Sequence, residues 1–134
     1  KPETFDFLGF THICSSRRSD GGFTLIRKTI AKRQRGKLNI IKSVLKQRCH
    51  DRPIKVGAWL KVVVQGYFNY YAVPSNMKTL DGFRTAVIRL WIKSMRRRSQ
   101  RGQSVPWKRF TRLINAFIPK ARATHPYPNQ RLCV

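Results

Sequence analysis

Two clusters of basic side chains in this sequence have the residue types and spacing that bind phosphate groups. Both lie near expected helix ends, and their members are Arg33, Arg35, Lys37 and Arg96, Arg97, Arg98, Arg101. Guanidinium and ammonium groups contact phosphate oxygens and position a nucleic acid without reading its sequence. We therefore predict nucleic-acid phosphate contacts at these residues. Arg17 and Arg18, in a turn-rich segment, form a weaker candidate of the same kind.

The charge of the whole chain indicates the same kind of partner. The 134 residues include 29 Lys and Arg but only 5 Asp and Glu, which gives a net charge of +24. A solvated surface would explain any single run of charge, but it does not explain an imbalance of this size. Such a chain repels itself unless a polyanion neutralises it, and nucleic acid is the obvious polyanion.

The sequence offers little for catalysis or metal binding. Phosphoryl transfer by metal ions needs clustered carboxylates, whereas the acidic residues here are scattered: Glu3, Asp6, Asp20, Asp51 and Asp81. His12 with Cys14, and Cys49 with His50, lack the paired spacing of metal ligands. We predict no catalytic residue, no metal site and no cofactor in this chain.

Cysteine use and hydropathy bear on the compartment. Cys14, Cys49 and Cys133 are widely spaced and odd in number, so we expect no disulfide framework and a reducing, cytoplasmic setting. The longest apolar cluster, Val62–Val64, is far shorter than a membrane span, and no membrane partner is expected. The chain begins at Lys1 with a strand pattern almost at once, which we interpret as a piece of a longer protein.

The elements that must position these residues begin with strands. Residues 4–13 predict one strand with a bulge at Gly9, and residues 23–26 predict a second. Residues 15–22 are turn-forming throughout, so the two strands are expected to make a hairpin with a long, basic tip. Because an isolated hairpin is marginally stable in water, it must pack against the rest of the chain or belong to a larger sheet.

From residue 28 onward, apolar residues recur at three- and four-residue spacing, which predicts three to four helices. Gly36 is expected to interrupt the first helix, Pro53 to open the second and Asn76 to cap the third. The predicted fold is therefore mainly α, with an N-terminal β-hairpin, a three- to four-helix bundle and an extended C-terminal tail.

The aromatic residues divide into two groups. Four lie on the apolar stripes of expected helices and are predicted to be core residues: Trp59, Tyr67, Phe83 and Trp91. Tyr70 and Tyr71 lie near a helix end, where their rings are candidates for contact with a base or a sugar.

Several segments resemble the C-terminal part of group II intron reverse transcriptases, also called maturases. Gly66–Asn76 is similar to the family's maturase-specific segment, and Thr4–Thr11 resembles the FLGF strand that closes the polymerase palm. Leu90–Gln100, Trp107 and His125–Pro128 follow in the family's usual order. The resemblance covers nearly the whole chain.

This resemblance implies a division of the chain and a role. Residues 1–27 would be the last palm strands, 28–119 the helical thumb or maturase-specific domain, and 120–134 an extended tail. The module would grip intron RNA or a template–primer duplex to assist splicing and reverse transcription. The catalytic Tyr-Ala-Asp-Asp motif and its Mg would lie in a missing upstream palm, encoded as a separate domain or lost.

The missing palm has a consequence for the hairpin. Phe5, Phe7 and Phe10 are expected to form an apolar surface that faces it. The 134 residues alone are not expected to show polymerase or nuclease activity, and whether they serve as part of an enzyme stays open.

Two other interpretations remain. The composition also fits a basic structural RNA-binding protein of the ribosomal kind, although three tryptophans are more than such proteins usually contain. The chain also fits a truncated remnant of a mobile element with no independent role.

Overall fold

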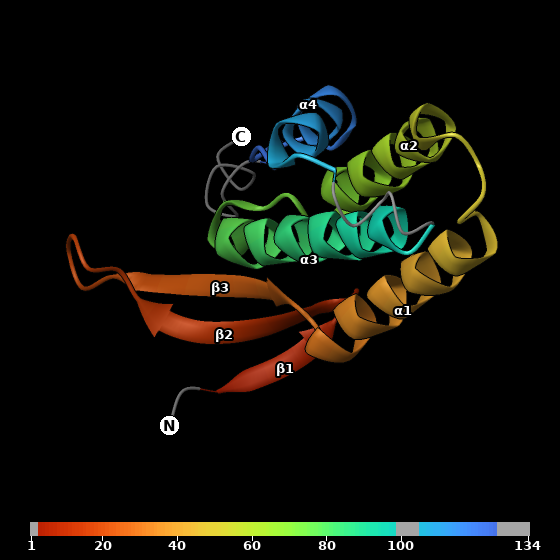
Figure 1. Cartoon of the computed structure of the whole chain (residues 1–134). Helices are drawn as coiled ribbons and strands as arrows, with labels where there is room; N and C mark the ends of the chain where they lie inside the picture. Colours follow the sequence, from red (N-terminus) through yellow and green to blue (C-terminus); the bar gives the residue numbers. More distant parts are fainter. Residues whose placement is uncertain (1–2, 99–104, 126–134) are drawn as a thin grey trace.

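A three-stranded antiparallel sheet lies at the N-terminal end of the described chain. The computed structural model describes residues 3–98 and 105–125. The strands lie in the order β1-β2-β3 (Figure 1), and their bounds are β1 Thr4–Phe7, β2 Phe10–Ser16 and β3 Phe23–Thr29. β2 and β3 form the predicted hairpin. β3 continues beyond the expected boundary at residue 27, because Thr29 is still paired with Phe10.

Within residues 3–98 and 105–125, four α-helices follow the sheet, and the prediction of a mainly α fold is confirmed. Pro53 opens the second helix as predicted, but the first helix continues through Gly36, so the expected interruption there is wrong. Burial of Ile41 and Leu45 further along stabilises this helix despite the glycine. The helices are α1 Ala31–Gln47, α2 Pro53–Tyr71, α3 Met77–Arg96 and α4 Trp107–Phe117, with a 3-10 helix η1 at Pro74–Asn76 before α3.

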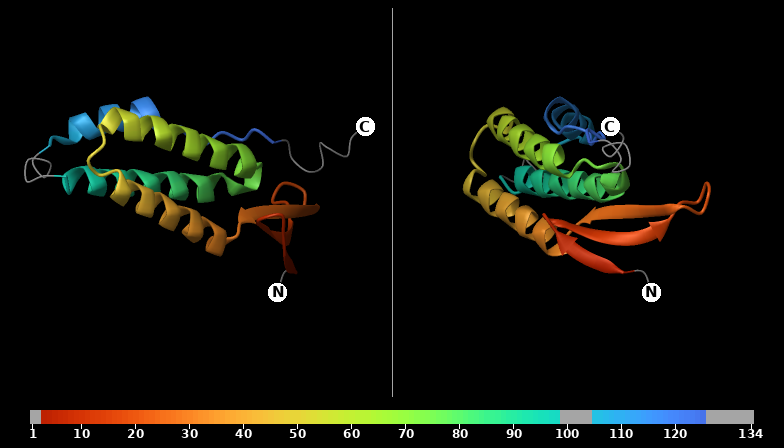
Figure 2. Two further views of the ribbon diagram at one scale, coloured as in Figure 1. Left: turned by 90° about the vertical axis from the view of Figure 1, so that its right-hand side faces the viewer. Right: turned by 180° about the vertical axis from the view of Figure 1, so that it is seen from behind.

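The helices give the molecule two distinct ends. α1 and α3 both begin at the sheet and run away from it, whereas α2 runs back toward it (Figure 2). The C-terminal ends of α1 and α3 and the beginnings of α2 and α4 therefore gather at the end opposite the sheet. We call this the helical end of the molecule.

The segment predicted as one strand is divided by a tight turn, so the expected bulge at Gly9 is wrong. Phe7 pairs with Phe10. Leu8 and Gly9 between them have φ values of 51° and 85°, as the favoured two-residue hairpin turn requires. A leucine in this region costs about 1–2 kcal/mol. The Tyr70 hydroxyl, from α2, offsets that cost by donating a 2.7 Å hydrogen bond to the Leu8 carbonyl.

The core combines aromatic side chains of α2, α3 and α4 with aliphatic side chains from all four helices. The prediction that Tyr67, Phe83 and Trp91 are core residues is confirmed: all three are buried, and the rings of Tyr67 and Phe83 are stacked 3.9 Å apart. Trp59 is only half-buried, and the Arg48 guanidinium lies 5.2 Å from its ring centroid.

Gly57 allows α2 to approach α3 and α4 closely. A Cβ added there would lie 2.6 Å from a ring carbon of Phe117 and 3.0 Å from the Trp91 ring. Trp91 and Phe117 themselves meet edge to face at 6.3 Å between centroids. These three residues therefore join the three helices at one point in the core.

Asn76 joins the sheet to the helices. The predicted position at the start of α3 is confirmed, but its side chain makes no capping hydrogen bond. Its Oδ1 instead accepts from the Thr29 backbone N–H at 3.0 Å, and its Nδ2 donates to the Thr29 hydroxyl at 2.8 Å and to the Tyr71 carbonyl at 3.0 Å. This fully buried carboxamide thus satisfies polar groups from β3 and α2 at once.

Asn76→Ala is expected to lower the free energy of unfolding by about 2–4 kcal/mol, because it leaves the buried Thr29 N–H unsatisfied and removes the hydrogen bonds to the Thr29 hydroxyl and the Tyr71 carbonyl. The neighbouring Ser75 provides a matched comparison. Its hydroxyl accepts from Arg27 N–H and donates to the Arg27 carbonyl, but in a part-buried position. Ser75→Ala should cost about 1 kcal/mol. Equal, small losses for the two variants in urea denaturation would contradict the role given to Asn76.

The described part of the C-terminal tail is extended and docked. The backbone N–H groups of Thr124 and His125 both donate to the Ala72 carbonyl at 3.2 Å. The His125 Nε2 lies 2.8 Å from the Asn69 carbonyl oxygen. These contacts hold the segment after α4 against the end of α2, as the prediction of an extended tail from residue 120 requires; residues 126–134 lie outside the described chain.

Burial raises the pKa of the Tyr67 phenol to about 12. The Thr29 side chain beside the phenol partly opposes this rise in pKa, and the nearby Tyr71 adds to it. An unfolded chain loses this proton near pH 10, whereas the folded chain keeps it to about pH 12. The stabilisation is therefore fully present below pH 10 and is lost as the pH rises to 12.

We expect the free energy of unfolding to fall by about 2–3 kcal/mol between pH 10 and pH 12 through Tyr67 alone. Tyr67→Phe separates this effect from the titration of the lysines, since it retains the ring and removes only the phenol. The difference in the free energy of unfolding between the unmodified chain and Tyr67→Phe should grow from pH 10 to pH 12. A constant difference would show that Tyr67 titrates like an exposed tyrosine.

Candidate nucleic-acid interface

The second half of α3 separates two grooves at the helical end. The α3–α4 groove has a volume of about 460 Å³ and is lined by Arg89, Ile92, Lys93, Arg96, Arg97 and Trp107. The α1–α3 groove has a volume of about 220 Å³ and is lined by Lys42, Leu45, Lys46, Cys49, Leu90, Lys93, Ser94 and Arg97. Lys93 and Arg97 line both grooves, so the two form one continuous cationic surface.

Helical spacing explains why these cations gather. Arg89, Lys93 and Arg97 follow one another at four-residue intervals, which places them on one face of α3. Lys42 and Lys46 have the same spacing on α1, which packs against α3. Lys42 and Lys46 therefore meet Lys93 and Arg97 where the two helices lie side by side. Arg89 lines only the α3–α4 groove.

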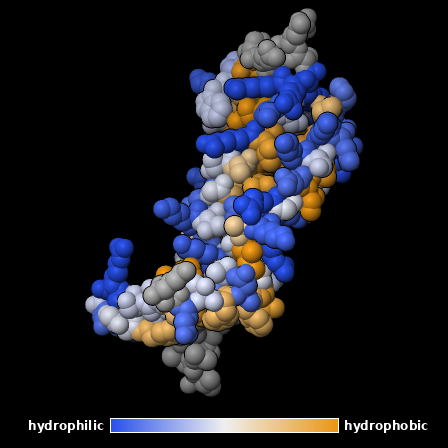
Figure 3. Space-filling view, turned by 90° about the horizontal axis from the view of Figure 1, so that it is seen from below, coloured by the Kyte–Doolittle hydropathy of each residue, from blue (hydrophilic) through white to orange (hydrophobic). Residues whose placement is uncertain are grey.

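Each groove combines cationic side chains with apolar ones. Leu45 and Leu90 line the α1–α3 groove, and Ile92 and Trp107 line the α3–α4 groove. No carboxylate is present among the described residues that line either groove. In the space-filling view, hydrophobic side chains along the helices are bordered by hydrophilic ones (Figure 3). Such a surface favours an anionic ligand that also carries apolar faces, as nucleotides do.

Two members of the predicted cluster at the end of α3, Arg96 and Arg97, lie in this surface. Arg97 lines both grooves, and the Arg96 guanidinium lies 5.3 Å from the Phe110 ring centroid beside the α3–α4 groove. Arg98 instead donates a 3.4 Å hydrogen bond to the His50 carbonyl and lines neither groove. Arg101 lies outside the described residues.

The other predicted clusters lie elsewhere. Arg33, Arg35 and Lys37 are in the first turns of α1, near the sheet. α1 has 17 residues, so about 25 Å separates its two ends. The two sequence clusters therefore do not form one patch.

The tip of the β2–β3 hairpin carries the weaker candidates. Both Arg17 and Arg18 are exposed there. Arg17 forms a 3.0 Å ion pair with Asp20, which neutralises part of its charge. Arg18 is the better candidate of the two for a phosphate contact.

The two tyrosines proposed for base or sugar contact differ in burial. Tyr71 is buried and packs edge to face on Phe10, with 5.1 Å between centroids, so its ring is a core side chain. Tyr70 is 52% exposed and stacks on Phe10 at 6.0 Å. A contact with a base or sugar therefore rests on Tyr70 alone, which lies at the sheet and not at the grooves.

Sequence reasoning missed four of the cations in the grooves: Lys42, Lys46, Arg89 and Lys93. None of the four is next to another charged residue in the sequence, so none belongs to a dense run of charge. Their i, i+4 spacing on two helices was a usable signal. That spacing predicts a shared face only once the packing of α1 on α3 is known.

Comparison of this chain with known protein families, with curated proteins and with solved structures gave no match. Among the helices in the described part of the chain, none has the length and hydropathy needed to cross a membrane. Within residues 3–98 and 105–125, no three His, Cys, Asp or Glu side chains come together as metal ligands would.

Proposed function

We propose that this chain is the RNA-binding thumb, or maturase-specific, module of a group II intron reverse transcriptase. It binds intron RNA or an RNA–DNA duplex in a reducing, cytoplasmic compartment, and it assists splicing and reverse transcription. The observation that carries the proposal is the cationic surface of the two grooves, to which α1 and α3 both contribute and where no carboxylate lies among the described lining residues. The sequence resemblance supplies the kind of RNA.

The geometry supports contact with the backbone of a nucleic acid. The cations are spread over two helices, and they border apolar side chains instead of a single deep anion site. Double-stranded RNA is recognised by its shape, its phosphates and its 2′-hydroxyl groups. A surface of this kind suits a duplex held along its phosphates.

Binding to a structured group II intron RNA tests this proposal, with an unrelated structured RNA of the same length as control. Both should be measured at about 50 and 200 mM salt, a range over which contacts with charge alone weaken strongly. We expect a preference for the intron that persists at the higher salt. If the two RNAs bind equally and both affinities fall together at the higher salt, the result would favour a generic basic RNA-binding protein. Copurification with ribosomal subunits would favour a ribosomal protein.

We also propose that the sheet packs against a polymerase palm supplied as a separate upstream domain. Phe5, Phe7 and Leu8 are exposed, and Phe23 is 73% exposed. The expectation that Phe10 belongs to this surface is wrong, because its ring is buried against the tyrosines of α2. Exposed apolar side chains gathered on one element commonly mark a contact with another protein.

Fluorescence of a dye that binds apolar surface tests this second proposal. The purified chain should bind the dye, and the double variant Phe5→Ser, Phe7→Ser should bind less of it at unchanged helix content. Adding the polymerase domain should displace the dye from the unmodified chain. A chain that stays monodisperse and binds no dye would contradict the proposal.

A further inference from the structure

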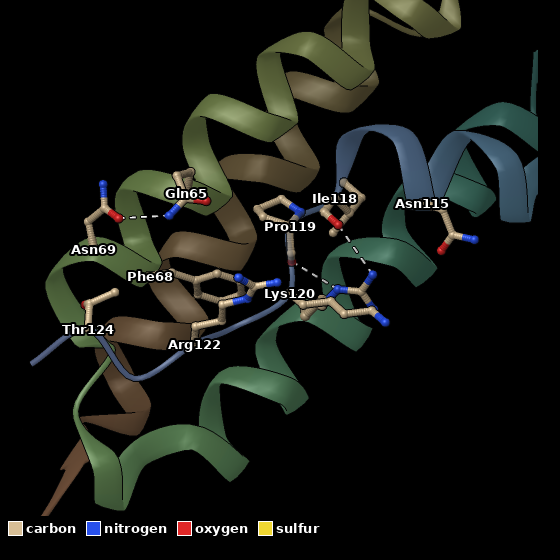
Figure 4. Close-up of a pocket in the computed structure, with 10 residues that line it drawn as sticks. Gln65, Phe68, Asn69, Asn115, Ile118, Pro119, Lys120, Arg122 and Thr124 are labelled. Atoms are coloured by element: carbon tan, nitrogen blue, oxygen red, sulfur yellow. Dashed lines mark hydrogen bonds between the residues drawn. The ribbon is translucent and has the colours of Figure 1, made fainter.

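A third cavity lies away from the grooves, between α2, α3 and the segment that follows α4. Its volume is about 550 Å³. Figure 4 shows Gln65 and Asn69 on α2 at one side, Asn115 on α4 at the other, and Lys120 and Arg122 on the segment between them. Binding sites for small molecules fall in the range of about 300–1,000 Å³, so the cavity is large enough for one nucleotide.

The lining combines two kinds of polar group with an apolar floor. Three carboxamides line the cavity, from Gln65, Asn69 and Asn115. Gln65 Nε2 donates to Asn69 Oδ1 at 2.8 Å, which leaves the Gln65 oxygen and the Asn69 amide nitrogen for a ligand, whereas Asn115 offers both a donor and an acceptor. Two exposed cations, Lys120 and Arg122, face the same space, and no carboxylate lies among the described lining residues. The apolar part comes from Phe68, Ile118 and Pro119.

The segment that carries the two cations is held at both of its ends. Arg84 Nε donates to the Pro119 carbonyl at 3.0 Å, and its Nη2 donates to the Ile118 carbonyl at 3.4 Å. At the other end, Thr124 and His125 donate to Ala72. Lys120 and Arg122 therefore belong to a fixed wall of the cavity and not to a free tail.

We infer that this cavity accepts a single unpaired nucleotide of the bound RNA. The carboxamides hydrogen-bond the edge of the base, and Lys120 and Arg122 contact its phosphate. Proteins read RNA sequence mainly from unpaired bases that leave the helix, and carboxamides match the donors and acceptors of base edges. The inference rests on the proposed RNA-binding function. It adds a second kind of contact, because the cavity would hold one unpaired nucleotide whereas the grooves would hold the backbone of a duplex.

Two RNA hairpins that differ only by one bulged nucleotide in the stem test the inference. The unmodified chain should bind the bulged hairpin about tenfold more tightly, as one well-formed set of base contacts gives. The double variant Asn115→Ala, Arg122→Ala should reduce that difference to less than about twofold while it still binds the paired hairpin. Both side chains are exposed, so thermal unfolding should be unchanged.

Lys61→Ala is the control for lost charge, because Lys61 is exposed on α2 and does not line the cavity. It should leave the tenfold difference intact. A photoreactive 4-thiouridine at the bulge should crosslink to the lining of the cavity in the unmodified chain, which means residues 65–69, Arg84 or residues 115–124.

Three results would overturn the inference. They are equal binding of the two hairpins by the unmodified chain, crosslinks that map outside residues 65–69, Arg84 and residues 115–124, and an equal loss of both affinities in the double variant. Each leaves the proposed RNA binding intact, since that function fails only if the chain shows no preference for intron RNA at the higher salt.

Discussion

Replacing Lys93, Arg96 and Arg97 together with alanine is expected to weaken RNA binding about a hundredfold at physiological salt. Each phosphate contact contributes about 0.7–0.9 to the slope of log K against log salt, which corresponds to about fivefold in affinity near 0.15 M. Three lost contacts should therefore lower the slope by about 2 to 3 units. The measurement is a salt titration of binding to a structured intron RNA.

The structure determines which three residues to replace. Lys93 and Arg97 line both grooves, and Arg96 lines the α3–α4 groove, whereas Arg98 is bonded to a backbone carbonyl. Arg96 also packs over Phe110, so the variant should first be shown to unfold at the same temperature.

A charge-matched control separates this local effect from the loss of net charge. It replaces three exposed lysines outside the two grooves, namely Lys55, Lys61 and Lys78. This control should lower the slope by less than about one unit. An unchanged slope in the groove variant would show that its three side chains face water in the complex, and the proposed interface would be wrong.

Trp91→Ala is expected to lower the free energy of unfolding by about 3–5 kcal/mol. The indole is 1% exposed and packs where α2, α3 and α4 meet, with Gly57 and Phe117 as neighbours. Alanine would leave a cavity that the three helices cannot close without moving. Urea denaturation measures the loss.

Trp107→Ala is the matched comparison, because it removes the same side chain from an exposed position. Trp107 is 61% exposed and lines the α3–α4 groove. It should cost less than about 1 kcal/mol of stability and should instead reduce RNA affinity. If Trp91→Ala weakened RNA binding at unchanged stability, Trp91 would be a ligand contact and its assignment to the core would be wrong.

The helices were predictable from the sequence because the spacing of their buried residues follows a single local rule. Phe83, Val87 and Trp91 recur at four-residue spacing, and all are buried in α3. Pro53 marks the start of α2 for an equally local reason, since proline fits the first turn of a helix.

Features that depend on distant contacts were not predictable in this way. Leu8 adopts a left-handed conformation that leucine rarely takes, and the hydroxyl that stabilises it comes from Tyr70, 62 residues later. Asparagine commonly caps helices, yet the side chain of Asn76 is buried, where it accepts a hydrogen bond from the Thr29 backbone N–H.

The candidate site shows the same limit. The density of charge along the sequence predicted phosphate contacts at Arg96 and Arg97, which line the α3–α4 groove. It predicted them equally at Arg33, which lies near the sheet at the other end of α1. Lys42 and Lys93 meet only because α1 packs on α3. Positions on separate helices can be assigned to one surface only after their packing is known.

The separation of the sheet from the helical end also determines how a complex can assemble. A ligand in the two grooves leaves Phe5, Phe7 and Phe23 uncovered, because they lie on the sheet at the opposite end of the molecule. Occupants of the two ends therefore do not compete, and either one can bind first. Any coupling free energy between them would pass through the packed helices and the contacts that join the sheet to α2 and α3, among them the Asn76 carboxamide and the Tyr70 hydroxyl.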